Sequence, residues 1–506
     1  MYRATASRLR ALKARNFKLG NRFLSSAAVA TSGGNISWLS GGGGYSSSLP
    51  SLMIPLADVK LPPPLPDHVE PAKTKITTLA NGLKIASQTS VTPAASIGLY
   101  VDCGSIYETP VSFGASHLLE RMAFKTTRNR SHLRVVREIE AIGGHVQASA
   151  SREQMGYTFD ALKTHVPEMV ELLVDCARNP VFLDWEVNEQ LQKVKAEISE
   201  ASKNPEALVL EAIHSAGYAG ALANPLLAPE SAINRLEWVQ FWEGIYWPKT
   251  TLLQEIVLAA YGGLNMKISI HCGATFGLIS LLSLALRSQN LCIREGDYRC
   301  QADSGSTHFA LAFEVPGGWH KEKEAIKLTV IQMLLGGGGS FSTGGPGKGM
   351  HSRLYARVLN NHPQFQSISA FSNIYNNTGI FGIQATTSSD FAAKAVDVVA
   401  NELIAISKPG EVDQVQLDRA KKSTKSAILM NLESRVIASE DIGRQVLTYG
   451  KRMEVDHFLN AVDEVTVKDI ASTAQKLLSS PVTLASYGDV LYFPSYDTVS
   501  SKFNSK

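Results

Sequence analysis

The chain of 506 residues has little cysteine, no apolar run long enough to cross a membrane, and no acidic residue near its start. Its five cysteines are widely scattered, which excludes a disulfide framework and favours a reducing compartment. The most membrane-like run, 274–286, has 13 residues, whereas a spanning helix needs about 20. With 44% hydrophobic and 19% charged residues, the composition excludes collagen-like, coiled-coil and globally disordered proteins.

The first 24 residues are predicted to be a mitochondrial transit peptide. No Asp or Glu precedes Asp58, and the segment is rich in arginine and serine without the apolar core of a secretory signal. Its basic residues are Arg3, Arg8, Arg10, Lys13, Arg15, Lys18 and Arg22. The predicted cleavage site lies near Arg22, Phe23, Leu24 and Ser25. The alternative interpretation is a basic tail for nucleic acid or membrane.

Removal of that segment changes the charge of the protein. The remaining chain has 42 basic and 46 acidic residues, a net charge of about −4. An acidic mature protein is poorly suited to nucleic acid and better suited to cationic partners. Residues 25–72 follow, with four consecutive glycines, several serines and four closely spaced prolines. This composition predicts a flexible and then stiffer linker without a core of its own.

The rest of the chain repeats one order of predicted elements. A strand–turn–strand at 76–85 opens the first copy. Its further strands are predicted at 95–101, 145–148 and 155–162, and its helices at 112–124, 166–177 and 185–202. The second copy has strands at 307–315, 365–371 and 379–386, and helices at 321–335, 391–406 and 415–433. The repeat predicts a duplicated α+β domain, with copies at 73–290 and 296–498.

One helix of the first copy carries part of a zinc motif. His117, Glu120 and Arg121 follow the spacing of H-x-x-E-H, in which two histidines hold zinc and the glutamate takes a proton from the bound water. Residues three and four apart share one face of a helix. The second histidine is replaced by Arg121, whose guanidinium stays protonated and has no lone pair for a metal.

The layout nevertheless resembles that of the pitrilysin-like (inverzincin) metallopeptidases. In that family the third zinc ligand is a glutamate on a later helix, and Glu197 matches its position. The resemblance implies a degenerate site of His117, Glu120, Arg121 and Glu197, without a catalytic residue or a metal in this chain. We expect Arg121 to pair with Glu120 or Glu197, so that an ion pair replaces the metal.

The second copy contains a glycine-rich tract at 336–349. It is not a phosphate-binding loop, because position 342 is Ser where glycine is needed and position 349 is Gly where Ser or Thr should bind Mg²⁺. A plain linker is the alternative to a peptide-binding flap whose bare backbone can approach an extended ligand. A helix is predicted after it, at 350–359. The predicted substrate-binding residues are Gly336, Gly337, Gly338, Gly339, Ser340, Phe341, Gly344, Gly345, Gly347, Lys348 and Gly349.

This tract and several other segments resemble the α subunits of mitochondrial processing peptidases, most closely the plant forms. The matching segments are 224–233, 307–319, 336–355, 375–381 and 426–437. The resemblance implies two pitrilysin-like (LuxS/processing-peptidase type) domains in tandem. It also implies a non-catalytic subunit that binds presequence peptides for a zinc-bearing β subunit. In plants the pair resembles the core subunits of ubiquinol–cytochrome c reductase (complex III), on the matrix side of the inner membrane.

Two other functions remain open at this point: an active zinc metalloendopeptidase, and a purely structural protein of a respiratory complex. The resemblance breaks from about 237 to 294, apart from an island at 257–262. The break is abrupt and no acidic residue occurs between Glu255 and Glu295. It predicts a frameshifted or mis-spliced reading of the gene in this region.

Overall fold

The computed structural model describes residues 73–79, 82–110, 112–227, 229–234, 256–262, 292–293, 296–339 and 350–504. They belong to one compact unit, which starts at Ala72. The predicted transit peptide, the linker and the apolar run at 274–286 lie outside the described residues. Of the helices described, none combines the length and the apolar character that spanning a membrane requires.

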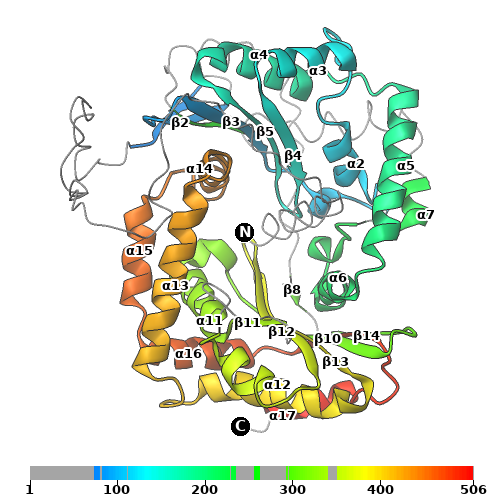
Figure 1. Ribbon diagram of the computed structural model, residues 1–506, viewed down its shortest axis with the longest axis vertical. Coiled ribbons are helices and arrows are strands. Elements are labelled where there is room, and N and C mark those ends of the chain that lie inside the picture. The colour runs from blue at the N-terminus through cyan, green and yellow to red at the C-terminus, as the bar shows by residue number, and fades with distance from the viewer. Residues whose placement is uncertain are drawn as a thin grey trace, which may run out of the picture. The chain divides into compact units, whose positions relative to one another are not determined.

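The first sheet has six strands and is built from the first half of the chain (Figure 1). Its strands in spatial order are β1 (Lys75–Thr78), β2 (Lys84–Gln88), β7 (Ile256–Tyr261), β3 (Ala94–Val101), β5 (Met155–Leu162) and β4 (His145–Ala150). β2 and β7 are parallel, and every other neighbouring pair is antiparallel. The helices of this half are α2 (Ala115–Met122), α3 (His132–Ala141), α4 (Val166–Arg178), α5 (Asp184–Ala201), α6 (Pro205–Gly217) and α7 (Glu230–Ile233).

The second sheet has the same construction. Its strands in spatial order are β11 (Gly337–Gly339), β12 (Phe365–Ile374), β13 (Gly379–Ser388), β10 (Ser306–Glu314), β14 (Thr483–Gly488) and β9 (Gly296–Gln301). β9 and β14 are parallel and the other pairs are antiparallel. The helices of this half are α11 (Glu322–Leu335), α12 (Ala392–Ser407), α13 (Gln414–Leu432), α14 (Arg435–Tyr449), α15 (Val455–Glu464), α16 (Val467–Leu478) and α17 (Tyr496–Asn504).

The two sheets confirm the predicted duplication. The order β2-β7-β3-β5-β4 in the first sheet matches β9-β14-β10-β13-β12 in the second, with the same strand directions. β7 takes the place of β14 and lies in the interior of its sheet. Residues 257–262, which keep the family resemblance inside the divergent region 237–294, therefore coincide with an interior strand of the first sheet.

A helix from the opposite half covers one face of each sheet. α14 packs against β3 and β7 of the first sheet, and α6 packs against β14, β10 and β9 of the second. α6 follows the long helix α5 as α14 follows the long helix α13, so the exchange is reciprocal (Figure 1). The other face of the first sheet is covered by α4. Strands buried on both faces read as continuous apolar runs, which explains the sequence AASIGLYV of β3.

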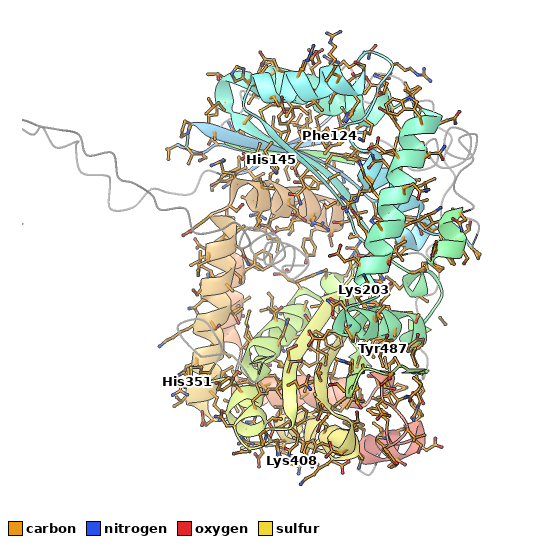
Figure 2. All side chains as sticks on the ribbon, turned by 45° about the vertical axis from the view of Figure 1, so that its right-hand side comes forward. Phe124, His145, Lys203, His351, Lys408 and Tyr487 are labelled. Atoms are coloured by element: carbon orange, nitrogen blue, oxygen red, sulfur yellow. The ribbon has the colours of Figure 1, made fainter. Side chains whose placement is uncertain are left out.

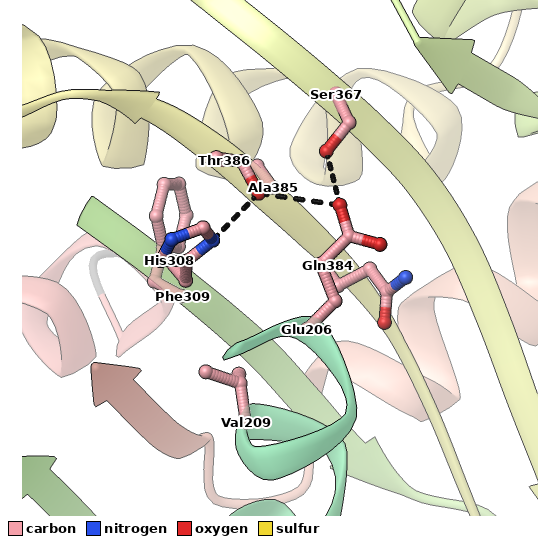
Figure 3. A pocket seen from close by; sticks show the side chains of 8 residues that line it. All are labelled: Glu206, Val209, His308, Phe309, Ser367, Gln384, Ala385 and Thr386. Carbon is pink, nitrogen blue, oxygen red and sulfur yellow. Dashed lines mark hydrogen bonds between the residues drawn. The ribbon is translucent and has the colours of Figure 1, made fainter. Parts of the chain in front are cut away.

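Polar contacts join the two halves around these helices. In α6, Glu206 accepts hydrogen bonds from Ser367 of β12 (2.7 Å) and Thr386 of β13 (3.4 Å), beside the small pocket drawn in Figure 3. Arg435 at the start of α14 pairs with Asp160 of β5 at 2.9 Å. Each half therefore supplies a helix that covers the sheet of the other half, together with the hydrogen bonds or ion pair that hold the helix there. Without the other half, one face of each sheet would be exposed.

The predicted helix at 350–359 is shorter than expected. The structure has a π-helix at Leu354–Leu359, and residues 350–352 before it form a turn and a bend. No helix is predicted from the sequence at α6 or α14, the two helices that each cover the sheet of the opposite half.

The contact between α14 and β3 generates a stability prediction. Gly443 of α14 lies on the ring of Tyr100, and a Cβ at Gly443 would lie 2.1 Å from that ring. We expect Gly443→Ala to lower the free energy of unfolding by about 1–3 kcal/mol, because the overpacking outweighs the better helix propensity of alanine. Denaturant unfolding measures this change. In a Tyr100→Leu background the same substitution should cost much less, and an equal cost in both backgrounds would contradict the packing argument.

Candidate functional site

The candidate site is built on α2, whose first turn is held by a buried carboxylate. Both oxygens of Glu108 accept backbone hydrogen bonds there, Oε2 from Gly114 (2.9 Å) and Oε1 from Ser116 (2.7 Å). Gly114 precedes the helix with φ 90°, in the left-handed region that favours glycine. Glu108 is 6% exposed. It therefore fixes the start of the helix that carries His117, Glu120 and Arg121.

Glu197 of α5 lies against two side chains of α2. Its Oε2 is 2.6 Å from Nη2 of Arg121 and 3.2 Å from Nε2 of His117. The predicted pairing of Arg121 with Glu197 is thus present. The side chains of Arg121 and Glu197 are 38% and 37% exposed, so the pair lies at the edge of the site and is accessible to solvent.

The position of Glu197 follows from the packing of α5. Val187, Leu191 and Val194 are buried in the first core, at the spacing of one helix face. Glu197 comes one turn after Val194 on that side of α5, and α5 packs against α2. The meeting of two segments far apart in sequence is therefore set by apolar packing.

Glu120 points to a different neighbour. Its Oε2 accepts a hydrogen bond from the backbone N–H of Ala150 at the end of β4, at 2.9 Å. The residue at the position of the general base is thus tied to the sheet edge. It is buried, as is His117.

The protonation of His117 bears on metal binding. Burial lowers the pKa of His117, and Arg121 adds to this effect while Glu120 and Glu197 oppose it. The ring is therefore neutral at neutral pH. Because a carboxylate only accepts hydrogen bonds, the ring donates through Nε2 to Glu197. The described part of the chain offers no hydrogen-bond partner to the buried Nδ1. In this arrangement Nε2 of His117 is engaged in a hydrogen bond with the same carboxylate that pairs with Arg121.

The side chains of the site do not fit a catalytic zinc ion. Such an ion needs three protein donors and an open position. Here His117 and Glu197 are the two possible donors at the motif, and the guanidinium of Arg121 contacts the carboxylate that would bind the metal. Elsewhere among the described residues, no group of three or more His, Cys, Asp or Glu side chains could hold a metal ion.

The glycine-rich tract begins as part of the second sheet. Gly337, Gly338 and Gly339 form β11, which pairs with Ser369, Ile368 and Ser367 of β12. A Cβ on Gly337 would lie 2.2 Å from the backbone oxygen of Ile368, and its φ is 115°. Glycine is therefore required at position 337, where the backbone of β11 approaches β12 most closely. The predicted residues Ser340, Phe341, Gly344, Gly345, Gly347, Lys348 and Gly349 lie outside the described residues.

The structure brings together His117, Arg121 and Glu197, whereas the glycine tract belongs to the other half of the chain.

Glu108 was not predicted from the sequence, where its signal would have been an acidic residue shortly before a helix that begins at a glycine. Phe124, which follows α2 with φ 60°, unusual for an aromatic residue, was not predicted either. Phe124 lies by the first sheet, with its ring centroid 6.2 Å from that of Tyr157 (Figure 2).

Two family descriptions match the chain. Residues 84–230 match "Insulinase (Peptidase family M16)" and residues 287–424 match "Peptidase M16 inactive domain". The chain is 64% identical to the mitochondrial-processing peptidase subunit alpha of Solanum tuberosum, over 100% of both chains. It is 60% identical to a probable mitochondrial-processing peptidase subunit alpha-2 of Arabidopsis thaliana, over 99% of this chain and 100% of that one. The human subunit alpha is 30% identical, over 87% and 86%.

The fold also occurs in a solved structure. A chain of complex III2 from Candida albicans matches with a TM-score of 0.71 and 19% sequence identity. The match covers 85% of this chain and 99% of that chain. At this identity the likeness shows the fold alone.

Replacing the arginine tests whether it is what prevents metal binding. We expect Arg121→His to complete a donor set with His117 and Glu197, so that zinc stabilises the variant by about 2–3 kcal/mol at a hundredfold excess over its Kd. Thermal unfolding with zinc and then with a chelator measures this, with Arg121→Gln as the control. Stoichiometric zinc in the unsubstituted chain would contradict the assignment.

A second prediction concerns the cap of α2. Burial raises the pKa of Glu108 to about 7, although the two backbone hydrogen bonds oppose the shift. A carboxyl with a raised folded-state pKa contributes stability that is present below its unfolded pKa and lost as pH rises through the folded one. The unfolding free energy of the unsubstituted protein should therefore fall between pH 5 and pH 8 as Glu108 ionises. In Glu108→Gln this fall should be smaller by about 1–3 kcal/mol. Exposed Glu140 provides the control, Glu140→Gln, and parallel pH profiles for all three proteins would refute this reading.

Proposed function

The chain belongs to peptidase family M16, and within it to the α subunits of mitochondrial-processing peptidase. We propose that it is the non-catalytic subunit that binds the presequences of imported precursors, while a zinc-bearing β subunit with an intact H-x-x-E-H motif cleaves them. It works in the mitochondrion, on the matrix side of the inner membrane. It needs no cofactor of its own, since the zinc belongs to the partner.

One observation carries the non-catalytic part of the proposal: Oε2 of Glu197 lies 2.6 Å from Nη2 of Arg121. A fixed cation at this place repels zinc, and the carboxylate is already satisfied. The neutral His117 donates its proton toward the same oxygen. No residue of this site can therefore activate a water molecule through a metal, which argues against an independent zinc endopeptidase.

The binding part of the proposal depends on charge and on the glycine-rich tract. A presequence is an amphipathic segment bearing arginines, so its receptor should offer acidic and apolar surface. The mature chain is acidic, with a net charge of about −4 once the first 24 residues are removed. The tract supplies bare backbone amides and carbonyls, which can approach an extended peptide more closely than a backbone with side chains.

We also propose a structural role as a core subunit of ubiquinol–cytochrome c reductase, alongside other complex III subunits. The shared fold with a chain of complex III2 from Candida albicans is compatible with this role. Co-purification from mitochondrial membranes tests it. A purely structural protein would not need the glycine-rich tract, and this difference separates the two roles.

Shortening the tract tests presequence binding directly. Residues 341–348 would be replaced by Gly-Ser-Gly-Ser, which leaves β11 intact. We expect the heterodimer with the β subunit to form normally and its affinity for a fluorescein-labelled presequence peptide to fall at least tenfold, or about 1.4 kcal/mol. Fluorescence anisotropy measures the affinity, and gel filtration measures the assembly. Unchanged affinity would favour the structural role instead.

A further inference from the structure

A small pocket lies between the two halves of the chain, at the start of α6 (Figure 3). Glu206 of α6 lines it from the first half. His308 of β10, Ser367 of β12, and Gln384 and Thr386 of β13 line it from the second half. We propose that this pocket binds the guanidinium group of an arginine in the presequence, with Glu206 as its main acceptor. This inference rests on the proposed function, and it assigns a binding residue that the sequence analysis did not single out.

The pocket contains hydrogen-bond acceptors that no donor of the described residues uses. Oε1 of Glu206 accepts hydrogen bonds from Oγ of Ser367 (2.7 Å) and Oγ1 of Thr386 (3.4 Å). Both end on this one carboxylate oxygen, as the dashed lines in Figure 3 show, and Oε2 receives none from the described residues. Oε1 of Gln384 is buried and also has no hydrogen-bond partner in the described part of the chain. Because unsatisfied buried acceptors are unfavourable, a ligand that suits the pocket brings donors.

The negative charge of Glu206 is not balanced by a neighbouring cation. Its two hydrogen-bond donors are uncharged hydroxyl groups, and no lysine or arginine among the described residues forms an ion pair with it. Burial lowers the pKa of His308, although Glu206 opposes the shift, so the ring is neutral at neutral pH. Nδ1 of that ring lies 2.9 Å from Oγ1 of Thr386. A donor that also carries a positive charge therefore complements this pocket best.

The other half of the duplicated fold shows which cation occupies the corresponding place. In the two sheets β5 corresponds to β13, and the covering helix α14 corresponds to α6. At the start of α14, Arg435 donates two hydrogen bonds to Asp160 of β5, from Nη2 to Oδ2 (2.9 Å) and from Nε to Oδ1 (3.3 Å). In the second half the helix carries the carboxylate of Glu206 and the strand carries the uncharged Thr386. The first half thus supplies a guanidinium where the second half leaves a carboxylate without one.

A guanidinium group suits these acceptors better than other cations do. It has five donors in one plane, so it can donate to Glu206 on α6 and to Gln384 on β13 together, whereas an ammonium is a compact point of charge. A metal ion would have Glu206 and His308 as its ligands here. Among the described residues, no group of three or more His, Cys, Asp or Glu side chains could hold such an ion. The ligand is therefore an arginine side chain rather than a lysine or a metal.

The position of the pocket suits a peptide held between the two halves. Glu206 is exposed, so a ligand reaches it from solvent. Ser367 pairs with Gly339, the last residue of β11, so the pocket lies close to the edge of the second sheet. On the other side, α6 directly follows α5, which carries Glu197 of the degenerate zinc site. An arginine bound at Glu206 therefore places the presequence in contact with both halves of the chain.

The test is a double-mutant cycle between the full heterodimer, with its β subunit, and the peptide. A fluorescein-labelled presequence peptide, and a series in which each arginine in turn is replaced by its uncharged isostere citrulline, are titrated against the unsubstituted protein and Glu206→Gln. Glutamine keeps an oxygen for the two hydroxyl donors and removes the charge. We expect Glu206→Gln to raise Kd of the arginine peptide about three- to tenfold. For the citrulline peptide that lacks the bound arginine, the same substitution should raise Kd less than twofold.

Two further variants complete the test. Glu230→Gln removes an exposed carboxylate from the first turn of another helix, α7, and should leave Kd unchanged. Gln384→Met removes the buried oxygen without a change of charge, and should raise Kd of the arginine peptide about two- to fivefold. Its thermal stability should stay the same or rise, because that oxygen has no hydrogen-bond partner among the described residues to lose. A merely structural role of Gln384 would instead lower the stability and leave Kd unchanged.

The outcomes separate the inference from the function beneath it. If the heterodimer binds the peptide no better than the β subunit alone does, the proposed function fails. If this chain adds affinity but Glu206→Gln leaves Kd unchanged, the pocket holds water only and the inference is wrong. It is also wrong if Glu206→Gln raises Kd equally for every peptide of the series, since the effect would then be that of overall charge. Should Glu206→Gln fail to assemble, Gln384→Met carries the test, and an unchanged Kd for that variant would overturn the inference.

Discussion

The ion pair between Arg121 and Glu197 is the interaction on which the proposed function of this protein depends. In a zinc peptidase the carboxylate would help to hold a dication, and the fold delivers it to that place by packing α5 on α2. Here a guanidinium supplies the positive charge instead, with Oε2 of Glu197 2.6 Å from it. The exchange keeps the local charges balanced while it removes both the open coordination position and the water that zinc would activate. Under the proposed function, the scaffold of a peptidase is thereby kept without its chemistry.

A second constraint operates on the scale of the whole fold. Each sheet has one face covered by a helix of the other half, α14 on the first and α6 on the second. The apolar contacts of these helices are reinforced by hydrogen bonds and ion pairs between the halves, such as that of Arg435 with Asp160. A chain duplicated in this way cannot separate into two independent domains. The degenerate zinc motif and β11, the described start of the glycine-rich tract, therefore belong to one compact unit.

Much of this could be read from the sequence, and the omissions have physical causes. Strand and helix periodicity, turn residues and the repeated order of elements predicted the duplicated α+β fold, because those signals are local. The spacing of His117, Glu120 and Arg121 predicted that these side chains share one face of a helix. The contact between Arg121 and Glu197 was predicted only from a family resemblance. Tertiary packing brings α5 to α2, and that packing has no local signal in the sequence. The crossing helices were missed for the same reason: the fit of Gly443 on Tyr100 has no local signal. The composition of the glycine tract predicts a flap or a plain linker, whereas its first glycines pair with β12.

The most direct test of the account is a cleavage assay on the purified chain alone, compared with the chain assembled with its β subunit. With a presequence peptide as substrate, the account predicts no hydrolysis by the isolated chain at any zinc concentration. It predicts chelator-sensitive hydrolysis once the β subunit is added. Chelator-sensitive cleavage by the isolated chain would contradict it, because Arg121 and Glu197 would then have to coexist with a working metal.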